Sequence, residues 1–250
     1  MEKLNRDIRL YYFLNQYDMQ MHGGGVREHE VIYNGHKIYY NVSPNIYGDI
    51  NTIFISGGRD AGRRPCFVLS IKGSLANLTS LERGVDCFVD RFDSSKDLVK
   101  LAFRMAKERG CTEFELTDTS KKICTTSSFR LSDVYFLTTG KTWYESIIPI
   151  KIKSMKEATL NEYRKIVKTN TWHDISTHLL YKGVDLNFIP LKGIDIKKAG
   201  SAMKVLSRIK SMKNDISCKF FNENAGSILA FSKIESLHDS TWYYNGVVCT

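Results

Sequence analysis

A few residues have the types and spacing that could support catalysis or metal binding. Asp174 and His178 lie four residues apart in a segment with helical periodicity, so they could share one helix face as an acid/base pair or as two metal ligands. The alternative is a surface histidine with a hydrogen-bonded neighbour, since no third ligand is predicted beside them. Cys111 could be a nucleophile only with a base beside it, and otherwise it is a core thiol. We therefore assign no catalytic residue and no metal ligand.

The segment 57–64 (GGRDAGRR) combines glycines with arginines, the combination from which a loop that binds anions can be built. Its glycine spacing resembles that of a Walker loop, but Arg63 and Arg64 stand where a lysine and a serine or threonine must reach phosphate and magnesium. The alternative is an exposed loop between two strands. We expect that second role for the segment.

The cysteines and aromatic pairs have structural explanations as well. The 6 cysteines include no CxxC pair and no close grouping with histidine, so we expect reduced, mostly buried thiols rather than a zinc site. Trp143 with Tyr144, and Trp242 with its two following tyrosines, could stack on nucleic-acid bases. Neither group is interleaved with arginines, so we expect both in the core or in a subunit interface.

The charge distribution gives the clearest indication of a binding surface. The chain of 250 residues has a net charge of +9, and residues 151–213 alone contain 14 basic and 5 acidic residues, so the remainder is neutral. This distribution is typical of a protein that docks on nucleic acid, an anionic membrane or an acidic protein, although a solvated helical surface is the alternative. The candidate contact residues are Arg164, Lys165, Lys168, Lys197, Lys198, Lys204, Arg208 and Lys210.

The first part of the chain has the pattern of strands. Residues 31–33 and 37–42 flank Asn34-Gly35, which suits a type I′ turn, so we predict a β-hairpin here. Residues 53–55 and 66–71 are the next predicted strands, and residues 85–89 are a further short one. The apolar segment 8–17 is predicted to form a short helix or strand on the body.

Residues 91–116 show a sharper pattern. Ser94 and Asp97 resemble a helix cap, Gly110 ends the predicted helix, and residues 113–116 alternate as a half-buried strand does. We predict a βαβ-like unit with two parallel strands. A further helix is expected from Leu131 to Gly140. The apolar stripe of the first helix consists of Leu98, Leu101, Ala102, Met105 and Ala106.

The chain becomes helical after about residue 150. Thr159 and Glu162 form a capping box for a helix that turns Tyr163, Ile166 and Val167 inward. Asp195 is predicted to cap a long helix whose apolar positions recur from residue 196 to residue 209. With 42% apolar residues and only 4 prolines the chain is a folded protein. We expect an α/β (α+β) fold: a mixed sheet with flanking helices in residues 1–150 and a basic, mainly helical part in residues 151–250.

The region from Cys87 to Tyr144 resembles the second half of the N-acetyltransferase superfamily. In that family a strand leads into a glycine-containing loop whose amides hold the pyrophosphate of acetyl coenzyme A at a helix start. The matching residues are Arg91, Ser94, Ser95 and Lys96, which makes them the candidate cofactor contacts. Ser94 and Lys96 occupy the glycine positions and Asp90, Asp93 and Asp97 surround them, so the resemblance implies the fold while we expect no cofactor.

A longer resemblance covers residues 114–121 and 131–144, which are similar to a segment of uncharacterised proteins of nucleocytoplasmic large DNA viruses. It implies a virion component such as a minor capsid protein. We therefore expect a non-enzymatic structural or interaction protein whose partners are other viral structural proteins, with nucleic acid as a further possible partner. An acyltransferase that uses acetyl coenzyme A is the alternative, and nucleic-acid binding through the basic part is a second one.

The N-terminal residues have no apolar stretch of signal-peptide length, and no window approaches the roughly 18 apolar residues of a membrane span. We therefore expect a protein that has no transmembrane segment and is not secreted, located in the virion or the host cytoplasm. The oligomeric state is not indicated by the sequence.

Overall fold

The computed structural model describes residues 28–33, 36–44, 52–57, 67–81, 95–125, 127–153, 155–190 and 200–246. The chain divides into two compact units, each described here by itself. The first comprises residues 1–116 and 244–250, and the second comprises residues 117–243. The boundary expected near residue 150 falls inside the second unit. The structure is a mixed α/β fold, as the sequence predicts.

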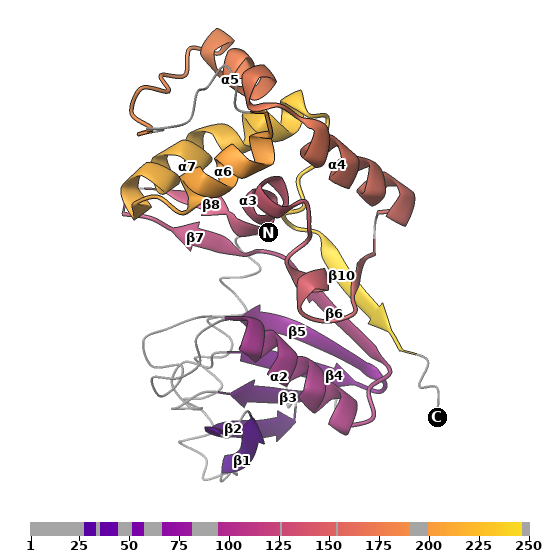
Figure 1. Cartoon of the computed structure of the whole chain (residues 1–250). Helices are drawn as coiled ribbons and strands as arrows, with labels where there is room; N and C mark the ends of the chain where they lie inside the picture. The colour runs from indigo at the N-terminus through magenta and orange to yellow at the C-terminus, as the bar shows by residue number, and fades with distance from the viewer. Residues whose placement is uncertain are drawn as a thin grey trace. The chain divides into compact units, whose positions relative to one another are not determined.

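The first unit contains a mixed sheet built mainly from antiparallel neighbours. Strands β1 to β5 pair in chain order, and each is antiparallel to the next. The predicted hairpin is confirmed as β1 and β2, although its Asn34-Gly35 turn lies outside the described residues. Figure 1 shows these strands in indigo and purple. Their bounds are β1 (Glu28–Tyr33), β2 (His36–Pro44), β3 (Thr52–Gly57), β4 (Phe67–Lys72) and β5 (Leu75–Leu81).

Strand β5 is absent from the sequence-based prediction. It follows β4 through a tight turn in which Gly73 has a φ of 58°, a conformation that favours glycine. Ala76 and Leu78 are buried while Asn77 and Thr79 are more exposed, so the strand alternates as a half-buried strand should. Its three polar residues hide this alternation from a search for apolar runs.

Helix α2 (Ser95–Glu108) and strand β6 (Glu113–Thr117) confirm the predicted helix and the strand after it. All five residues of the predicted stripe are buried, from Leu98 to Ala106. Gly110, with a φ of 77°, ends the helix as expected. Strand β6 pairs in parallel with β5, which takes the place that the prediction gave to residues 85–89. The candidate strand 85–89 and the cap residue Ser94 lie outside the described residues.

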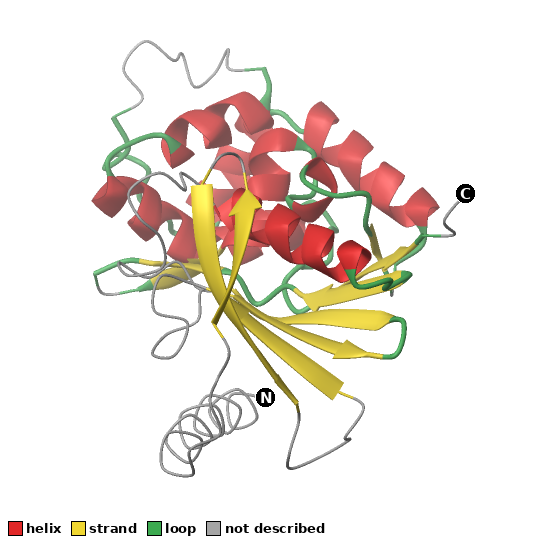
Figure 2. Ribbon diagram, turned by 90° about the horizontal axis from the view of Figure 1, so that it is seen from below, coloured by secondary structure: helices red, strands yellow, loops and turns green. Residues whose placement is uncertain are grey.

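The second unit is mainly helical. In Figure 2 its helices are red, and Figure 1 labels the helices α3 to α7. Two short antiparallel pairs, β7 with β8 and β9 with β10, accompany the helices. The bounds are β7 (Lys121–Ile123), β8 (Ser128–Arg130), α3 (Leu131–Thr139), the 3₁₀ helix η1 (Tyr144–Ser146), β9 (Lys151–Ile152), α4 (Glu157–Thr169), α5 (Trp172–Tyr181), α6 (Ala202–Lys210), α7 (Asn214–Phe231) and β10 (Thr241–Asn245).

Two predicted helix starts are wrong. Helix α4 begins at Glu157 with Lys156 as its N-cap, so Thr159 lies within the first turn and the predicted capping box is absent. Helix α6 begins at Ala202 with Ser201 as its N-cap. Gly200 is not helical, so the apolar stripe predicted from residue 196 does not belong to one continuous helix. Asp195, its predicted cap, lies outside the described residues.

The core of the second unit is formed by the helices and by large aromatic side chains. Trp172, Phe220 and Phe221 are almost completely buried. Phe221 of α7 contacts Phe129 of β8, with ring centroids 5.6 Å apart. In the sequence, α7 is visible only as apolar clusters without a clear cap. Helix-helix contacts join α5 and α6 to α7, so burial stabilises this helix despite its weak capping signal.

The expectation that the cysteines are all reduced is wrong for one pair. Cys124 and Cys218 form a disulfide that joins the end of β7 to the first turns of α7, with Cα atoms 6.1 Å apart. Their separation of 94 positions in the sequence conceals this proximity. Cys111 remains a free, buried thiol.

Among the helices of the described residues, none combines the length and the apolar character needed to cross a lipid bilayer.

Candidate functional site

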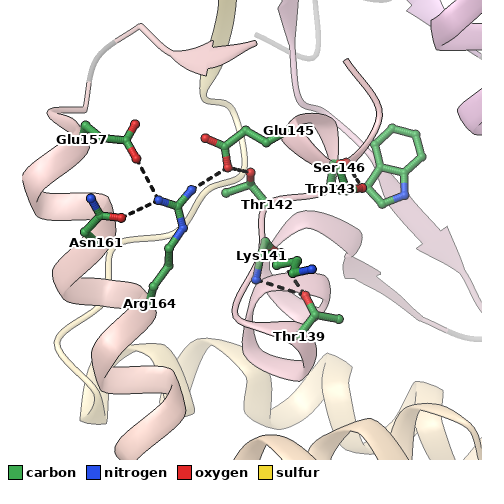
Figure 3. Close-up of polar contacts among 9 residues, drawn as sticks. All are labelled: Thr139, Lys141, Thr142, Trp143, Glu145, Ser146, Glu157, Asn161 and Arg164. Carbon is green, nitrogen blue, oxygen red and sulfur yellow. Dashed lines mark hydrogen bonds and ion pairs between the residues drawn. The ribbon is translucent and has the colours of Figure 1, made fainter. Parts of the chain in front are cut away.

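An open cleft in the second unit lies between helix α4 and the segment that joins α3 to β9. Its volume is about 760 Å³, and Figure 3 shows the polar contacts around it. Buried isoleucines form its apolar part, and charged side chains surround them. The lining residues are Lys141, Thr142, Glu145, Ser146, Ile148, Pro149, Ile150, Lys151, Glu157 and Arg164.

Arg164 is the centre of a hydrogen-bond network in this cleft. Its Nη1 donates to Glu157 Oε1 at 2.8 Å and to Asn161 Oδ1 at 2.6 Å, and its Nη2 donates to Glu145 Oε2 at 2.7 Å. Thr142 also donates a hydrogen bond to Glu145. Partial burial by itself would lower the pKa of Arg164, but Glu157 and Glu145 raise it above its usual value. The network joins α4 to η1 and the residues before it (Figure 3).

This network changes how Arg164 is interpreted. The sequence predicts it as an outward contact for a partner, whereas its guanidinium is held by two carboxylates and an amide, and its side chain is only 23% exposed. A partly buried guanidinium with such partners fixes the shape of the cleft. The exposed lysines nearby are the groups that remain available to an acidic partner.

Four exposed lysines belong to the elements that meet around Gly140, namely the end of α3, helix α4 and helix α6, and we call them the lysine patch. A Cβ atom at Gly140 would lie 3.8 Å from Lys168 Cε and 3.7 Å from Met203 Sδ, so the Lys168 side chain crosses the end of α3 beside α6. Lys141 follows Gly140, and Lys204 follows Met203. The lysine patch consists of Lys141, Lys165, Lys168 and Lys204.

The lysine patch is not neutralised by its surroundings. Across the described ranges, none of its four ammonium groups forms an ion pair with a carboxylate. Helix α6 contains no acidic residue, and the last two turns of α4, residues 163–169, contain none either. Gly140, whose φ of 64° ends α3, allows the close approach of these elements.

Of the four other lysine and arginine residues predicted as contacts, two lie outside the described residues and two are on α6. Lys197 and Lys198 lie outside the described residues. Arg208 is exposed one turn after Lys204 on α6. Lys210 is half-buried, and its ammonium lies 4.9 Å from the centre of the Tyr135 ring. Of the residues predicted from sequence, Lys165, Lys168 and Lys204 therefore belong to one surface, and Lys141 is an addition from the structure.

Asp174 and His178 do not act as a pair. Asp174 lies in the first turn of α5. Its carboxylate accepts a hydrogen bond from the Thr171 hydroxyl at 2.6 Å, and its backbone N–H donates to the oxygen of that hydroxyl. His178 Nε2 lies 3.1 Å from Ser227 Oγ, and its ring stacks on Phe231 at 4.6 Å. Both side chains thus hold helix ends and neighbouring helices together, which is the structural alternative given above.

The candidates of the first unit give little support to a reactive site. Burial raises the pKa of the Cys111 thiol, so this group is a poor nucleophile at neutral pH. Ser95 and Lys96 are the first residues of α2, while Arg91 and Ser94 lie outside the described residues. Gly57 ends β3, and residues 58–64 of the glycine-rich loop also lie outside them.

The aromatic pairs belong to the core of the second unit where they are described. Tyr144 and Trp242 are buried, and their ring centroids are 5.6 Å apart. Trp143 contacts Tyr144 edge to face at 4.8 Å. These rings are packed against one another, so they do not form a platform on which bases could stack.

Sequence reasoning missed a buried carboxyl group, Asp118. It is 1% exposed, and its Oδ1 accepts hydrogen bonds from the backbone N–H and the hydroxyl of Ser120, while its Oδ2 has no hydrogen-bond partner. Burial raises the pKa of Asp118, although Ser120, His238 and Ser132 oppose the rise. Burial likewise raises the pKa of Tyr144 far above its usual value, and the charge of Asp118 contributes to that rise.

The segment 236–240 closes over this buried carboxyl group. Burial lowers the pKa of His238, and its Nδ1 has no hydrogen-bond partner. The backbone of Asp118 exchanges hydrogen bonds with Asp239 and Ser240 at 2.7 and 3.0 Å. Asp133, also buried, accepts the Leu237 N–H and the Ser236 hydroxyl, each at 2.8 Å. Its place two residues after the predicted strand 113–116 is the only sequence signal for Asp118.

The described residues contain no group of three or more His, Cys, Asp or Glu side chains that could hold a metal ion. No protein-family model, no curated protein and no solved structure matches this chain.

Proposed function

We propose that the protein is a non-enzymatic structural or interaction protein that holds an acidic partner against the lysine patch of its second unit. The observation that carries this proposal is that Lys141, Lys165, Lys168 and Lys204 are all exposed on elements that meet at Gly140, without a neutralising carboxylate among the described residues. Clustered ammonium groups attract polyanions and accelerate their association. Part of the basic segment 151–213 is thereby assigned to one defined surface, the lysine patch.

The roles of the reactive residue types support a binding function. Asp174 is hydrogen-bonded to Thr171, the N-cap of α5, His178 contacts Ser227 and Phe231, and the Cys111 thiol is buried. Each therefore has a structural task that accounts for its position. The resemblance of residues 114–121 and 131–144 to proteins of large DNA viruses favours a place in a virion, where the partner would be another structural protein or the genome.

The binding of polyanions tests this proposal. We expect the full chain to bind a fluorescently labelled DNA duplex and labelled polyglutamate at low salt, with affinity that falls steeply as salt rises. Lys165→Glu/Lys168→Glu should weaken both by about tenfold or more. For DNA, the slope of log affinity against log salt should become shallower by roughly 0.9 for each phosphate that the variant no longer neutralises. Fluorescence anisotropy at several salt concentrations measures both quantities.

A matched control separates the lysine patch from the overall charge. Lys182→Glu/Lys213→Glu changes the net charge by the same amount at exposed positions outside the patch. This variant should keep most of the affinity. Equal losses in the two variants, or no binding to either polyanion at low salt, would contradict the proposal.

Acyl transfer from acetyl coenzyme A is the second candidate function, and one observation favours it. The first unit has antiparallel strands β1 to β5 followed by α2 and by β6, which is parallel to β5. A parallel pair joined through a helix is what the resemblance to N-acetyltransferases implies. Lys96 nevertheless stands in the first turn of α2, where the family has a glycine or alanine.

Calorimetric titration with acetyl coenzyme A discriminates the two functions. We expect no saturable binding, because side chains replace the glycines that let backbone amides approach the pyrophosphate, and Asp90, Asp93 and Asp97 repel it. Micromolar affinity would favour the acyltransferase instead.

A further inference from the structure

The β7–β8 hairpin forms a two-stranded sheet with open edges. Among the strands that the structure describes, β7 and β8 pair only with each other, with Lys122 opposite Phe129 and Ile123 opposite Ser128. Phe129 is buried against Phe221, and the disulfide from Cys124 to Cys218 holds the end of β7 on α7. The hairpin is thus fixed to a helix in the second unit. A partner that binds its edge therefore pays little entropy for ordering the hairpin.

The hydrogen-bond register determines which backbone groups face outward. Cys124 N–H donates to Ser127 O at 2.8 Å, and Leu131 N–H donates to Ser120 O at 3.1 Å. In an antiparallel ladder the bonded pairs alternate, so Lys122 is the next residue whose backbone faces β8. The N–H and C=O groups of Lys121 and Ile123 therefore point away from β8, along the outer edge of β7.

This outer edge is exposed. The Ile123 side chain is 85% exposed, which is unusual for an isoleucine in a strand, and Lys121 is exposed too. Within the part of the chain that the structure describes, neither residue has a hydrogen-bond partner on that edge. A strand edge with free amide and carbonyl groups beside an exposed apolar side chain is a template for pairing with another strand.

The positive charge of the hairpin indicates which kind of strand can bind its edge. Lys121, Lys122 and Arg130 are cations, and residues 120–130 include no aspartate or glutamate. A second copy of the hairpin would bring cations close to cations, which opposes self-association, and lysines on edge strands are a common protection against it. An extended segment with acidic residues complements the same edge.

We propose that the outer edge of β7 binds an extended acidic segment of a partner protein as an additional antiparallel strand. An apolar residue of the partner lies opposite Ile123, and acidic residues lie opposite Lys122 and Lys121. Backbone hydrogen bonds to Lys121 and Ile123 supply affinity, while the charges and the apolar contact supply specificity. This surface is distinct from the lysine patch and does not depend on it.

N-methylated peptides test the proposed backbone pairing directly. The probe is a labelled, end-blocked peptide Thr-Val-Glu-Glu-Thr, whose valine pairs with Ile123 and whose second glutamate pairs with Lys121. The N–H groups of these two residues face β7. We expect a dissociation constant of about 10 to 1000 µM for so short an edge. Methylation of those two amides should weaken binding at least tenfold, whereas methylation of the first glutamate and the last threonine should leave it within twofold.

Variants of the full chain provide the second arm of the experiment. Ile123→Pro removes an N–H that faces outward, at an edge position where proline is tolerated, and it should abolish binding. Ile123→Ala keeps that N–H and should retain partial binding, with thermal melts of both variants reporting their fold. Lys121→Glu should lose the acidic peptide and gain a peptide with lysine in place of both glutamates. Lys165→Glu/Lys168→Glu should bind the probe like the unaltered chain.

Three results would overturn the proposal. One is the absence of saturable peptide binding, and another is equal binding of the two N-methylated peptides, which would indicate a purely electrostatic contact. The third is unchanged binding by a folded Ile123→Pro variant.

Discussion

Two buried aspartates of the second unit have opposite surroundings. Asp118 has one carboxylate oxygen without a hydrogen-bond partner, and Asp133 has both oxygens occupied. An orphaned buried acceptor costs about 1–3 kcal/mol, whereas a satisfied one contributes to stability. The two carboxyl groups therefore affect stability differently. In the sequence, Asp118 only follows a strand and Asp133 only lies in the first turn of a helix, so this difference is not visible there.

Asp118→Asn should raise the free energy of unfolding at neutral pH, by about 1 kcal/mol or more. The amide keeps an oxygen for the two Ser120 bonds and carries no charge, and its NH₂ group can donate to the neighbouring Ser132 hydroxyl, which has no partner of its own. Because the pKa of Asp118 is raised in the folded state, its contribution is greatest below the unfolded value near 3.8 and is lost as pH rises through the folded pKa. The variant should lack this loss, as denaturant titrations at about pH 4 and about pH 7 can measure.

Asp133→Asn is the matched comparison and should destabilise the protein by about 1–3 kcal/mol. Ser236 Oγ already accepts hydrogen bonds from Arg130 and from the His238 N–H, so it must donate to Asp133. An amide group facing that oxygen would leave a donor without an acceptor. If the urea midpoints of the two variants shifted in the same direction, this would contradict the opposite effects predicted for the two carboxyl groups.

At the scale of single elements, α2 is the clearest case of a helix held by one apolar face. Leu101→Asp should place an unpaired charge in the core, since Leu101 is fully buried. This costs several kcal/mol out of the roughly 5–15 kcal/mol of a typical domain, so the variant should be insoluble or unfolded. Lys100→Asp, on the exposed side of the same helix, should change stability by no more than about 0.5 kcal/mol. Equal melting temperatures for the two variants would contradict the prediction that Leu101 lies on the buried face of α2 and Lys100 on the exposed one.

The disulfide between β7 and α7 leads to a second prediction for an element. Cys124→Ser should lower the stability of the second unit by about 2–5 kcal/mol, because the bond restricts a long loop in the unfolded chain. Dithiothreitol should destabilise the unaltered protein by a similar amount and leave Cys124→Ser unchanged. Denaturant melts with and without the reductant measure this, and a mass difference of two hydrogens under non-reducing conditions reports the bond itself. Equal melts for the unaltered protein in both conditions would argue against the disulfide.

At the scale of the whole molecule, the second unit contains a core that is complete within its own segment. Trp172, Phe220, Phe221 and Ile209 are buried, and all lie in residues 117–243. We expect a fragment of these residues to fold alone, with a cooperative thermal transition and near-ultraviolet circular dichroism from its tryptophans. A fragment that shows helical content but no cooperative transition would mean that the unit needs the rest of the chain.

Local patterns in the sequence determined much of the first unit. The Asn-Gly hairpin, the stripe from Leu98 to Ala106 and the glycine that ends α2 are all set within a few residues, because turn chemistry and helix periodicity are local properties. Strand β5 escapes prediction because its polar residues obscure its alternation. The starts of α4 and α6 are misplaced because capping signals are short and recur by chance.

The candidate surfaces depended on tertiary structure. Sequence identified a basic segment, but only packing brought Gly140, the residue before Lys141, beside Lys168 and turned Arg164 toward Glu145 and Glu157. The Cys124–Cys218 bond joins residues 94 positions apart, and the exposed edge of β7 depends on which strands remain unpaired. Residues far apart in the chain meet only when the core has formed, so charge and composition predicted an acidic partner, whereas only the fold decided which basic side chains lie near one another.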